Sequence, residues 1–168
     1  MEILSQVVSI FAMMSIVLSF QCKSNKKLTA CLALGAFLFA ASYFMKGAYA
    51  GAALNILTLF ANLACLKESL RKKWVFGIVA LAFVVSTCFT MDSWWSWVLM
   101  AAQLSGIYAV MFKSGKFIRN IRFFFISPVW LITNTVVVFL IGGIICETIT
   151  MASIIISFVR YRKTGFEK

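Results

Sequence analysis

The chain has 168 residues, of which 62% are hydrophobic and only 12% are charged, and it contains no histidine. Its mean hydropathy is +0.97, whereas a soluble domain has about half of its residues apolar and about a quarter charged. This composition excludes a disordered chain, a nucleic-acid-binding domain and a secreted disulfide scaffold as leading interpretations. Seven apolar stretches of about 20 residues would cross a bilayer and use most of the chain, which predicts one all-α polytopic transmembrane domain over residues 1–168.

Seven apolar runs predict the spans of this bundle. In chain order they are 3–20, 28–45, 48–66, 74–91, 94–112, 123–141 and 144–159. The predicted links are Gln21 to Lys27, Lys46-Gly47, Lys67 to Lys73, Asp92, Lys113 to Arg122 and Gly142-Gly143, followed by a short basic tail over 160–168. Glu2 rather than a basic segment precedes the first run, so we interpret that run as a retained helix and not as a cleaved signal peptide.

The cations behind the net charge of +11 are unevenly distributed between the two sides of the predicted bundle. Of the sixteen Lys and Arg residues, fifteen fall on the predicted side that holds the C-terminus, and Lys46 alone falls on the other side. Short loops rich in Lys and Arg stay in the cytoplasm, which predicts an outside N-terminus and an inside C-terminus. Every basic cluster caps a span, so we expect contact with the lipid bilayer and no nucleic-acid partner.

Similar segments recur along the chain. Lys23-Ser24-Asn25-Lys26 returns as Lys113-Ser114-Gly115-Lys116, and Gly51 and Asn55 match Gly143 and Glu147. These matches predict a parallel 3+1+3 arrangement, with repeat one over 3–73, a linker helix over 74–91 and repeat two over 94–163. The alternative is that the common sorting of basic loops and the small residues of packed helices produce the likeness.

Polar side chains inside the spans are candidate binding residues, because at membrane depth they face a bundle interior or a watery cavity. Asn55, Thr58 and Asn62 recur at helical spacing and form one stripe of the third span. Glu147 and Thr150, followed by Ser153 or Ile154, form a second stripe in the seventh span. We interpret both stripes as substrate-binding. The alternatives are hydrogen bonds that only join helices and, for Glu147, a place in the outer headgroup region.

The only proline of the chain lies in the sixth span. Pro128 removes a backbone donor and is expected to kink the helix. Trp130 could stack on a ring-shaped solute and Asn134 adds an amide, so this segment is a candidate gate as well as part of the site. The alternative is a kink that only accommodates packing.

Three segments carry a resemblance to a known family. They are Gly47-Ala48-Tyr49-Ala50-Gly51-Ala52-Ala53-Leu54-Asn55, Pro128-Val129-Trp130-Leu131-Ile132-Thr133-Asn134, and the ending Ile154 to Arg160. Nearly the whole chain resembles the YgjV-type family of bacterial inner membrane proteins, which implies a multi-pass protein of that membrane. Its plan is distantly similar to the SWEET sugar facilitators and PnuC-type vitamin transporters, although the proline-glutamine dipeptide of many such relatives is absent.

These observations favour a membrane transporter over an enzyme. Four of the five acidic residues lie in predicted links or tails, and neither a catalytic group nor a metal or cofactor site is expected. The expected function is transport or facilitation of a small polar solute, sugar-like or vitamin-like, that binds between the two repeats. The alternative is a non-transporting receptor or accessory subunit. Gly77 and Ala80 to Ala82 would allow a second copy to pack closely, which leaves a homo-oligomer open.

Overall fold

The computed structural model describes residues 2–90, 93–113 and 115–161, and within these ranges every regular element is a helix. Seven helical stretches of the described residues are long and apolar enough to cross a membrane, as predicted. They are α1 (Glu2–Gln21), α2 (Asn25–Met45), α3 (Tyr49–Leu66), α4 (Lys73–Thr90), α5 (Trp95–Phe112), a sixth span over Gly115–Val137, and α8 (Ile141–Arg160). The sixth span consists of α6 (Gly115–Ile121), η2 (Arg122–Ile126), α7 (Ser127–Ile132) and η3 (Thr133–Val137), and a short helix, η1 (Glu68–Leu70), links α3 to α4.

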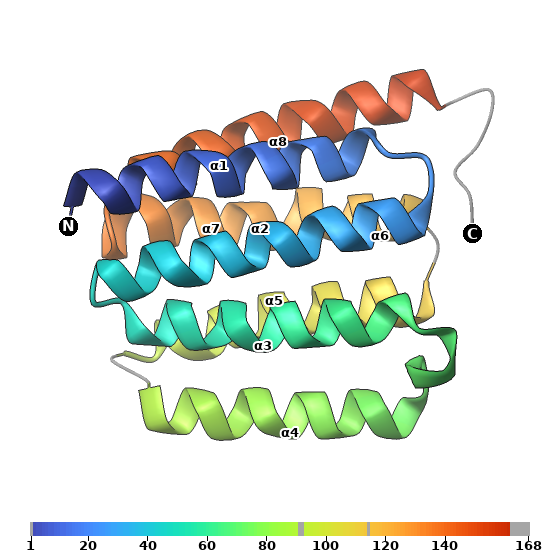
Figure 1. Cartoon of the computed structure of the whole chain (residues 1–168), viewed down its shortest axis with the longest axis horizontal. Helices are drawn as coiled ribbons and strands as arrows, with labels where there is room; N and C mark the ends of the chain where they lie inside the picture. The colour runs from blue at the N-terminus through green and yellow to red at the C-terminus, as the bar shows by residue number, and fades with distance from the viewer. Residues whose placement is uncertain (1, 91–92, 114, 162–168) are drawn as a thin grey trace.

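The spans form two layers that face each other. Figure 1 shows α1, α2 and α3 side by side, with α8, the sixth span and α5 behind them. The fourth helix lies at the edge of the bundle, where it packs on α3 and α5. We call the end that holds the α1–α2, α3–α4 and α5–α6 links the basic end, because most of the cations lie there. The N-terminal end of α1 lies at the opposite end.

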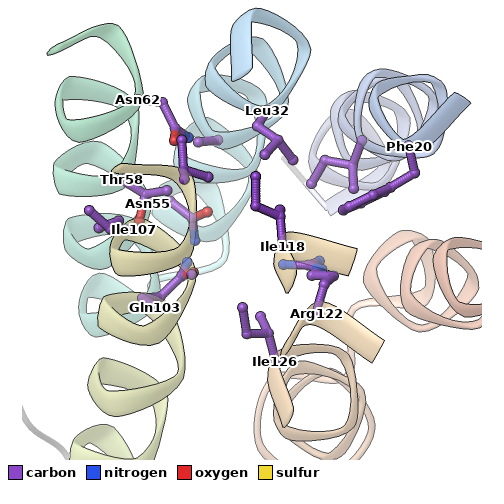
Figure 2. Close-up of a pocket in the computed structure, with 14 residues that line it drawn as sticks. Phe20, Leu32, Asn55, Thr58, Asn62, Gln103, Ile107, Ile118, Arg122 and Ile126 are labelled. Carbon is purple, nitrogen blue, oxygen red and sulfur yellow. The ribbon is translucent and has the colours of Figure 1, made fainter. Parts of the chain in front are cut away.

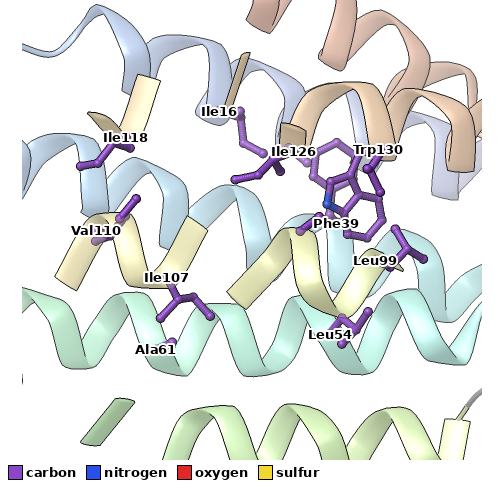
Figure 3. Packing of buried hydrophobic residues seen from close by; sticks show 14 of the residues in the cluster. Ile16, Phe39, Leu54, Ala61, Leu99, Ile107, Val110, Ile118, Ile126 and Trp130 are labelled. Carbon is purple, nitrogen blue, oxygen red and sulfur yellow. The ribbon is translucent and has the colours of Figure 1, made fainter. Parts of the chain in front are cut away.

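The exterior of the bundle is as apolar as its interior. Phe89 and Val136 are 86% and 76% exposed, and many other large apolar side chains are more than half exposed. Soluble monomers do not present so large an apolar surface, whereas lipid chains solvate it. Inside, Figure 3 shows aliphatic and aromatic side chains from several spans in one packed cluster, which includes Ile16, Leu54 and Trp130.

The predicted start of the sixth span is wrong. The stretch from Lys113 to Arg122 was expected to be a link, but the helix begins at Gly115, eight residues before the predicted start at 123, and it ends at Val137 rather than at 141. The reason is that its arginines find partners inside the bundle. Arg119 is completely buried and donates hydrogen bonds to the carbonyls of Phe20 (3.2 Å) and Cys22 (2.9 Å) at the end of α1. Two of the fifteen cations assigned to one side, Arg119 and Arg122, are therefore interior groups.

The predicted link at Gly142-Gly143 is also wrong, because both glycines lie in the first turn of α8. The connection is made by residues 138–140. There Phe139 takes a left-handed φ of 50° and the Leu140 amide donates to the Asn134 carbonyl (3.0 Å), which closes the helix end. The glycines serve close packing instead. A Cβ at Gly142 would overlap the Ser9 hydroxyl of α1 and come within 2.8 Å of the Ser9 Cβ.

Some predicted features lie outside the described residues. These are the turn at Asp92, Ser114 of the segment Lys113-Ser114-Gly115-Lys116, and residues 162–168 of the basic tail.

The contact at Gly142 generates a stability prediction. Gly142→Ala forces α1 and α8 apart and is expected to lower the free energy of unfolding by about 1–3 kcal/mol, the usual cost of overpacking. Gly77→Ala is the matched control, because nothing lies within 4 Å of the added methyl group there. Thermal unfolding in detergent measures both. Equal melting temperatures for the two variants would contradict the close approach of α1 and α8.

Candidate functional site

A cavity of about 60 Å³ lies in the middle of the bundle, between the two layers. Figure 2 shows Asn55, Thr58 and Asn62 of α3 beside Gln103 of α5 on one side, with Arg122 of η2 across the space from them. The other lining residues are apolar: Ile16, Phe20, Leu32, Ala36, Gly106, Ile107, Val110, Ile118 and Ile126. The predicted polar stripe of the third span therefore faces a real cavity.

A second cavity of about 30 Å³ adjoins the first. The two share four lining residues, Ile16, Asn55, Gln103 and Arg122. The second cavity adds Phe39, Tyr43, Trp130, Asn134 and Glu147 to its wall. Its lining residues come from α1, α2, α3, α5, the sixth span and α8, so both layers contribute to one central polar region.

The amides of this region keep much of their hydrogen-bonding capacity. Asn55 donates through Nδ2 to the Gly51 carbonyl (2.8 Å). Within the described residues, the side chains of Asn62 and Gln103 have no regular hydrogen bond, although they are only 3% and 7% exposed. Buried amides normally have partners, so water or a polar solute is needed to satisfy them.

An ion pair joins the sixth span to α8. Arg122 Nη2 lies 2.6 Å from Glu147 Oε1, and the two side chains are 11% and 5% exposed. Ser127 lies near the carboxylate at a geometry that falls short of a regular hydrogen bond. Within the described residues, Arg122 Nε and Glu147 Oε2 are buried and also lack a regular hydrogen bond. The pair is therefore joined at one point, and each partner keeps one buried atom without a regular hydrogen bond. Glu147 faces the interior of the bundle.

Tyr43, Asn134 and Trp130 form a partition across the bundle. The Tyr43 hydroxyl donates to Asn134 Oδ1 (2.5 Å), and the Tyr43 and Trp130 rings lie 5.5 Å apart. Tyr43 also lines a third cavity of about 50 Å³ on the side toward the opposite end. The glycine at Gly143 makes room for this partition, since a Cβ there would strike the Asn134 amide.

The helical pattern of the sixth span changes on both sides of Pro128. Before it, η2 is a π-helix in which the Ser127 amide donates to the Arg122 carbonyl. After it, η3 is a second π-helix, in which the Val138 amide donates to the Thr133 carbonyl (3.0 Å). Such π segments occur frequently at functional sites. Here Arg122 begins the first and Asn134 lies in the second, so both departures position a side chain of the site.

Six of the predicted binding residues come together around the first two cavities: Asn55, Thr58, Asn62, Trp130, Asn134 and Glu147. Thr150 lies elsewhere. It is fully buried, its hydroxyl lies 3.8 Å from the Cys146 sulfur, and it is not among the lining residues described for the two cavities. Ser153 accepts a hydrogen bond from Gln21 (2.6 Å), so this part of α8 faces α1.

Three residues of the site were missed by the sequence reasoning. Gln103 is an amide within an apolar run, a signal that would have found it. Arg122 was assigned to a link because of its basic neighbours. Tyr43 offers no signal in the sequence, since a tyrosine near the end of a span is typical of the membrane interface.

The comparison with known families agrees with the geometry of a membrane bundle. The chain matches the Imp-YgjV family, described as a bacterial inner membrane protein, over residues 3–165. Nothing among curated proteins or solved structures matches it. The match covers almost the whole chain and all seven apolar helices. The chain therefore belongs to the Imp-YgjV family and is a multi-pass protein of the bacterial inner membrane.

Proposed function

We propose that the protein moves a small polar solute across the membrane through the centre of its bundle, without catalysing a reaction. The observation that carries this proposal is the row of cavities between the layers. Amides and an ion pair line it at a depth where such groups are costly. Side chains that served only to join helices would be satisfied by each other, whereas Asn62 and Gln103 face open space.

The present conformation is a closed one on this proposal. The first cavity of about 60 Å³ has room for a few water molecules, each of which needs about 10–15 Å³ in this measure. The partition made by Tyr43, Asn134 and Trp130 separates the solute site from the third cavity toward the opposite end. Passage of a solute then requires the Tyr43–Asn134 hydrogen bond to open.

The sixth span supplies the movement in this mechanism. Its π segments have lost part of the regular hydrogen-bond ladder, and Pro128 between them lacks an amide donor. A helix bends at such positions at lower cost than elsewhere. Bending there would shift Asn134 away from Tyr43 while Arg122 remains at the solute site.

The proposal includes the orientation and the duplication expected from the sequence. The basic end lies in the cytoplasm, since most cations outside the sixth span gather there. One layer consists of α1, α2 and α3, and the layer that faces it consists of α5, the sixth span and α8. This arrangement is compatible with two parallel three-helix repeats, with α4 as the linker. The solute site then lies between the repeats.

Fusions to the C-terminus test the orientation. A fluorescent protein fused there is expected to fold and fluoresce, and alkaline phosphatase fused there is expected to be inactive, because phosphatase requires the periplasm. The matched control inserts both reporters at Lys46-Gly47, where the reverse result is expected. Active phosphatase at the C-terminus would invert the proposed orientation.

Swelling of proteoliposomes tests transport. Purified protein is reconstituted, and re-swelling after osmotic shock with glycerol, urea or ribose is followed by light scattering. We expect faster entry of at least one solute than into protein-free vesicles. Asn55→Ala and Asn62→Ala should each lower that rate by about fivefold, the worth of one hydrogen bond. Asn120→Ala is the control, because Asn120 lines an outer groove of α6 and α8. Equal rates in all three variants would place the path elsewhere.

The partition generates an opposite prediction. Tyr43→Phe keeps the ring but removes the donor to Asn134, so the closed conformation loses about 0.5–1.5 kcal/mol and the entry rate should rise by about two- to tenfold. Tyr108→Phe is the matched control, since Tyr108 lies on α5 against Phe76 and Phe112. The same swelling assay measures both variants, and a slower rate for Tyr43→Phe would show that the hydroxyl binds solute rather than closing the path.

A further inference from the structure

The ion pair determines which charge the solute site can accept. Arg122 and Glu147 are the charged side chains among the residues that line the first two cavities, and together they carry no net charge. An anion that entered would meet Arg122 only beside the carboxylate of Glu147. A cation would meet Glu147 only beside the guanidinium. In a small cavity of low dielectric, either arrangement is strongly unfavourable.

The pair is also joined in a way that leaves two of its buried atoms without a regular hydrogen bond. A single contact of 2.6 Å connects Nη2 and Oε1, while Nε on one partner and Oε2 on the other have no regular hydrogen bond within the described residues. A bidentate pair would have used all four atoms. Both atoms are buried in this conformation, so a solute reaches them only when the site opens. An uncharged group that accepts and donates a hydrogen bond then satisfies Nε and Oε2 without separating the charges.

A zwitterion could bind the same two atoms with its carboxylate and its ammonium, but it would lose the hydration of two full charges. Taking charges out of water is costly, whereas a neutral polar group that gains hydrogen bonds loses much less hydration. The neighbouring amides of Asn55 and Gln103 are uncharged and combine donors with acceptors, as hydroxyl or amide groups of a neutral solute require.

We propose that the Arg122–Glu147 ion pair is the specificity-determining element of the solute site and restricts it to uncharged solutes that offer both hydrogen-bond donors and acceptors. This inference rests on the proposed transport function and adds the class of solute to it. The pair acts as a filter: when the site opens, the polar groups of the solute bind to its two unsatisfied atoms, and its two charges disfavour ions.

The test compares three probes of similar size in proteoliposomes: glycerol, potassium glycerate and serine. Valinomycin is added so that potassium can follow glycerate. In the wild-type protein, glycerol should enter at least about tenfold faster than glycerate or serine, because only the charged probes face an uncompensated charge. Glu147→Gln leaves Arg122 without its counter-charge and should raise glycerate entry by about tenfold.

The double variant Arg122→Gln/Glu147→Gln is the control for folding and for charge. It removes both charges while it keeps amide donors and acceptors, so the ratio of glycerol entry to glycerate entry should fall below the wild-type ratio. Melting temperature and gel-filtration profile establish that each variant is folded. If Glu147→Gln fails to fold, the wild-type comparison and the double variant still decide.

The outcomes separate this inference from the proposed function. Wild-type entry of glycerate or serine as fast as glycerol overturns the filter but leaves transport intact. A folded Glu147→Gln variant that excludes glycerate as strongly as the wild type overturns it too. If none of the probes, urea or ribose enters any variant faster than protein-free vesicles, the transport function itself is contradicted and the filter falls with it.

Discussion

In hydrocarbon, a polar group that finds no partner inside the protein finds none at all, and this constraint explains how the polar side chains of the bundle are used. Most serines and threonines satisfy it locally. Ser19 and Thr58, for example, donate to carbonyls three or four residues earlier in their own helices. Long amides cannot always do so. Asn62 and Gln103 remain without regular partners in the described structure and mark a region where water or solute must complete their hydrogen bonds.

Two arginines of the sixth span are subject to the same need for partners inside the protein, but only one of them has all of its surroundings filled by such partners. Arg119 binds the carbonyls of Gly115, Phe20 and Cys22 and the hydroxyl of Ser157, so its charge is fully surrounded and holds the end of α1 against α6 and α8. Arg122, three residues later, has one ionic contact and faces the cavities. The first arginine is a structural clamp. The second keeps one buried donor, Nε, without a regular hydrogen bond in the described part of the chain.

The spans could be predicted from the sequence, because their length and apolarity follow directly from bilayer thickness. The stripe of Asn55, Thr58 and Asn62 could also be predicted, because helical periodicity places the three residues on one face. The sequence does not show which helix or cavity each face of a span contacts. Thr150 shares its helix with Glu147 yet lies away from the cavity. Arg119 and Arg122 were assigned to a link, because composition cannot show that carbonyls and a carboxylate of other helices bind their side chains. The Tyr43–Asn134 contact joins residues 91 positions apart, beyond any local pattern.

Replacement of a buried ion pair by apolar side chains is often neutral or stabilising, so stability alone does not explain the Arg122–Glu147 pair. Its position gives it another role. Arg122 is the first residue of a π segment, and Glu147 belongs to α8, which packs against the second half of the same span. A bend of the sixth span at η2 therefore changes the distance between the two charges. On the proposed function, a solute that binds to the unsatisfied atoms of the pair also stabilises one bend of that span over another. On the proposed function, recognition and movement are parts of a single equilibrium, because the arginine that binds the solute lies in the segment where the helix bends.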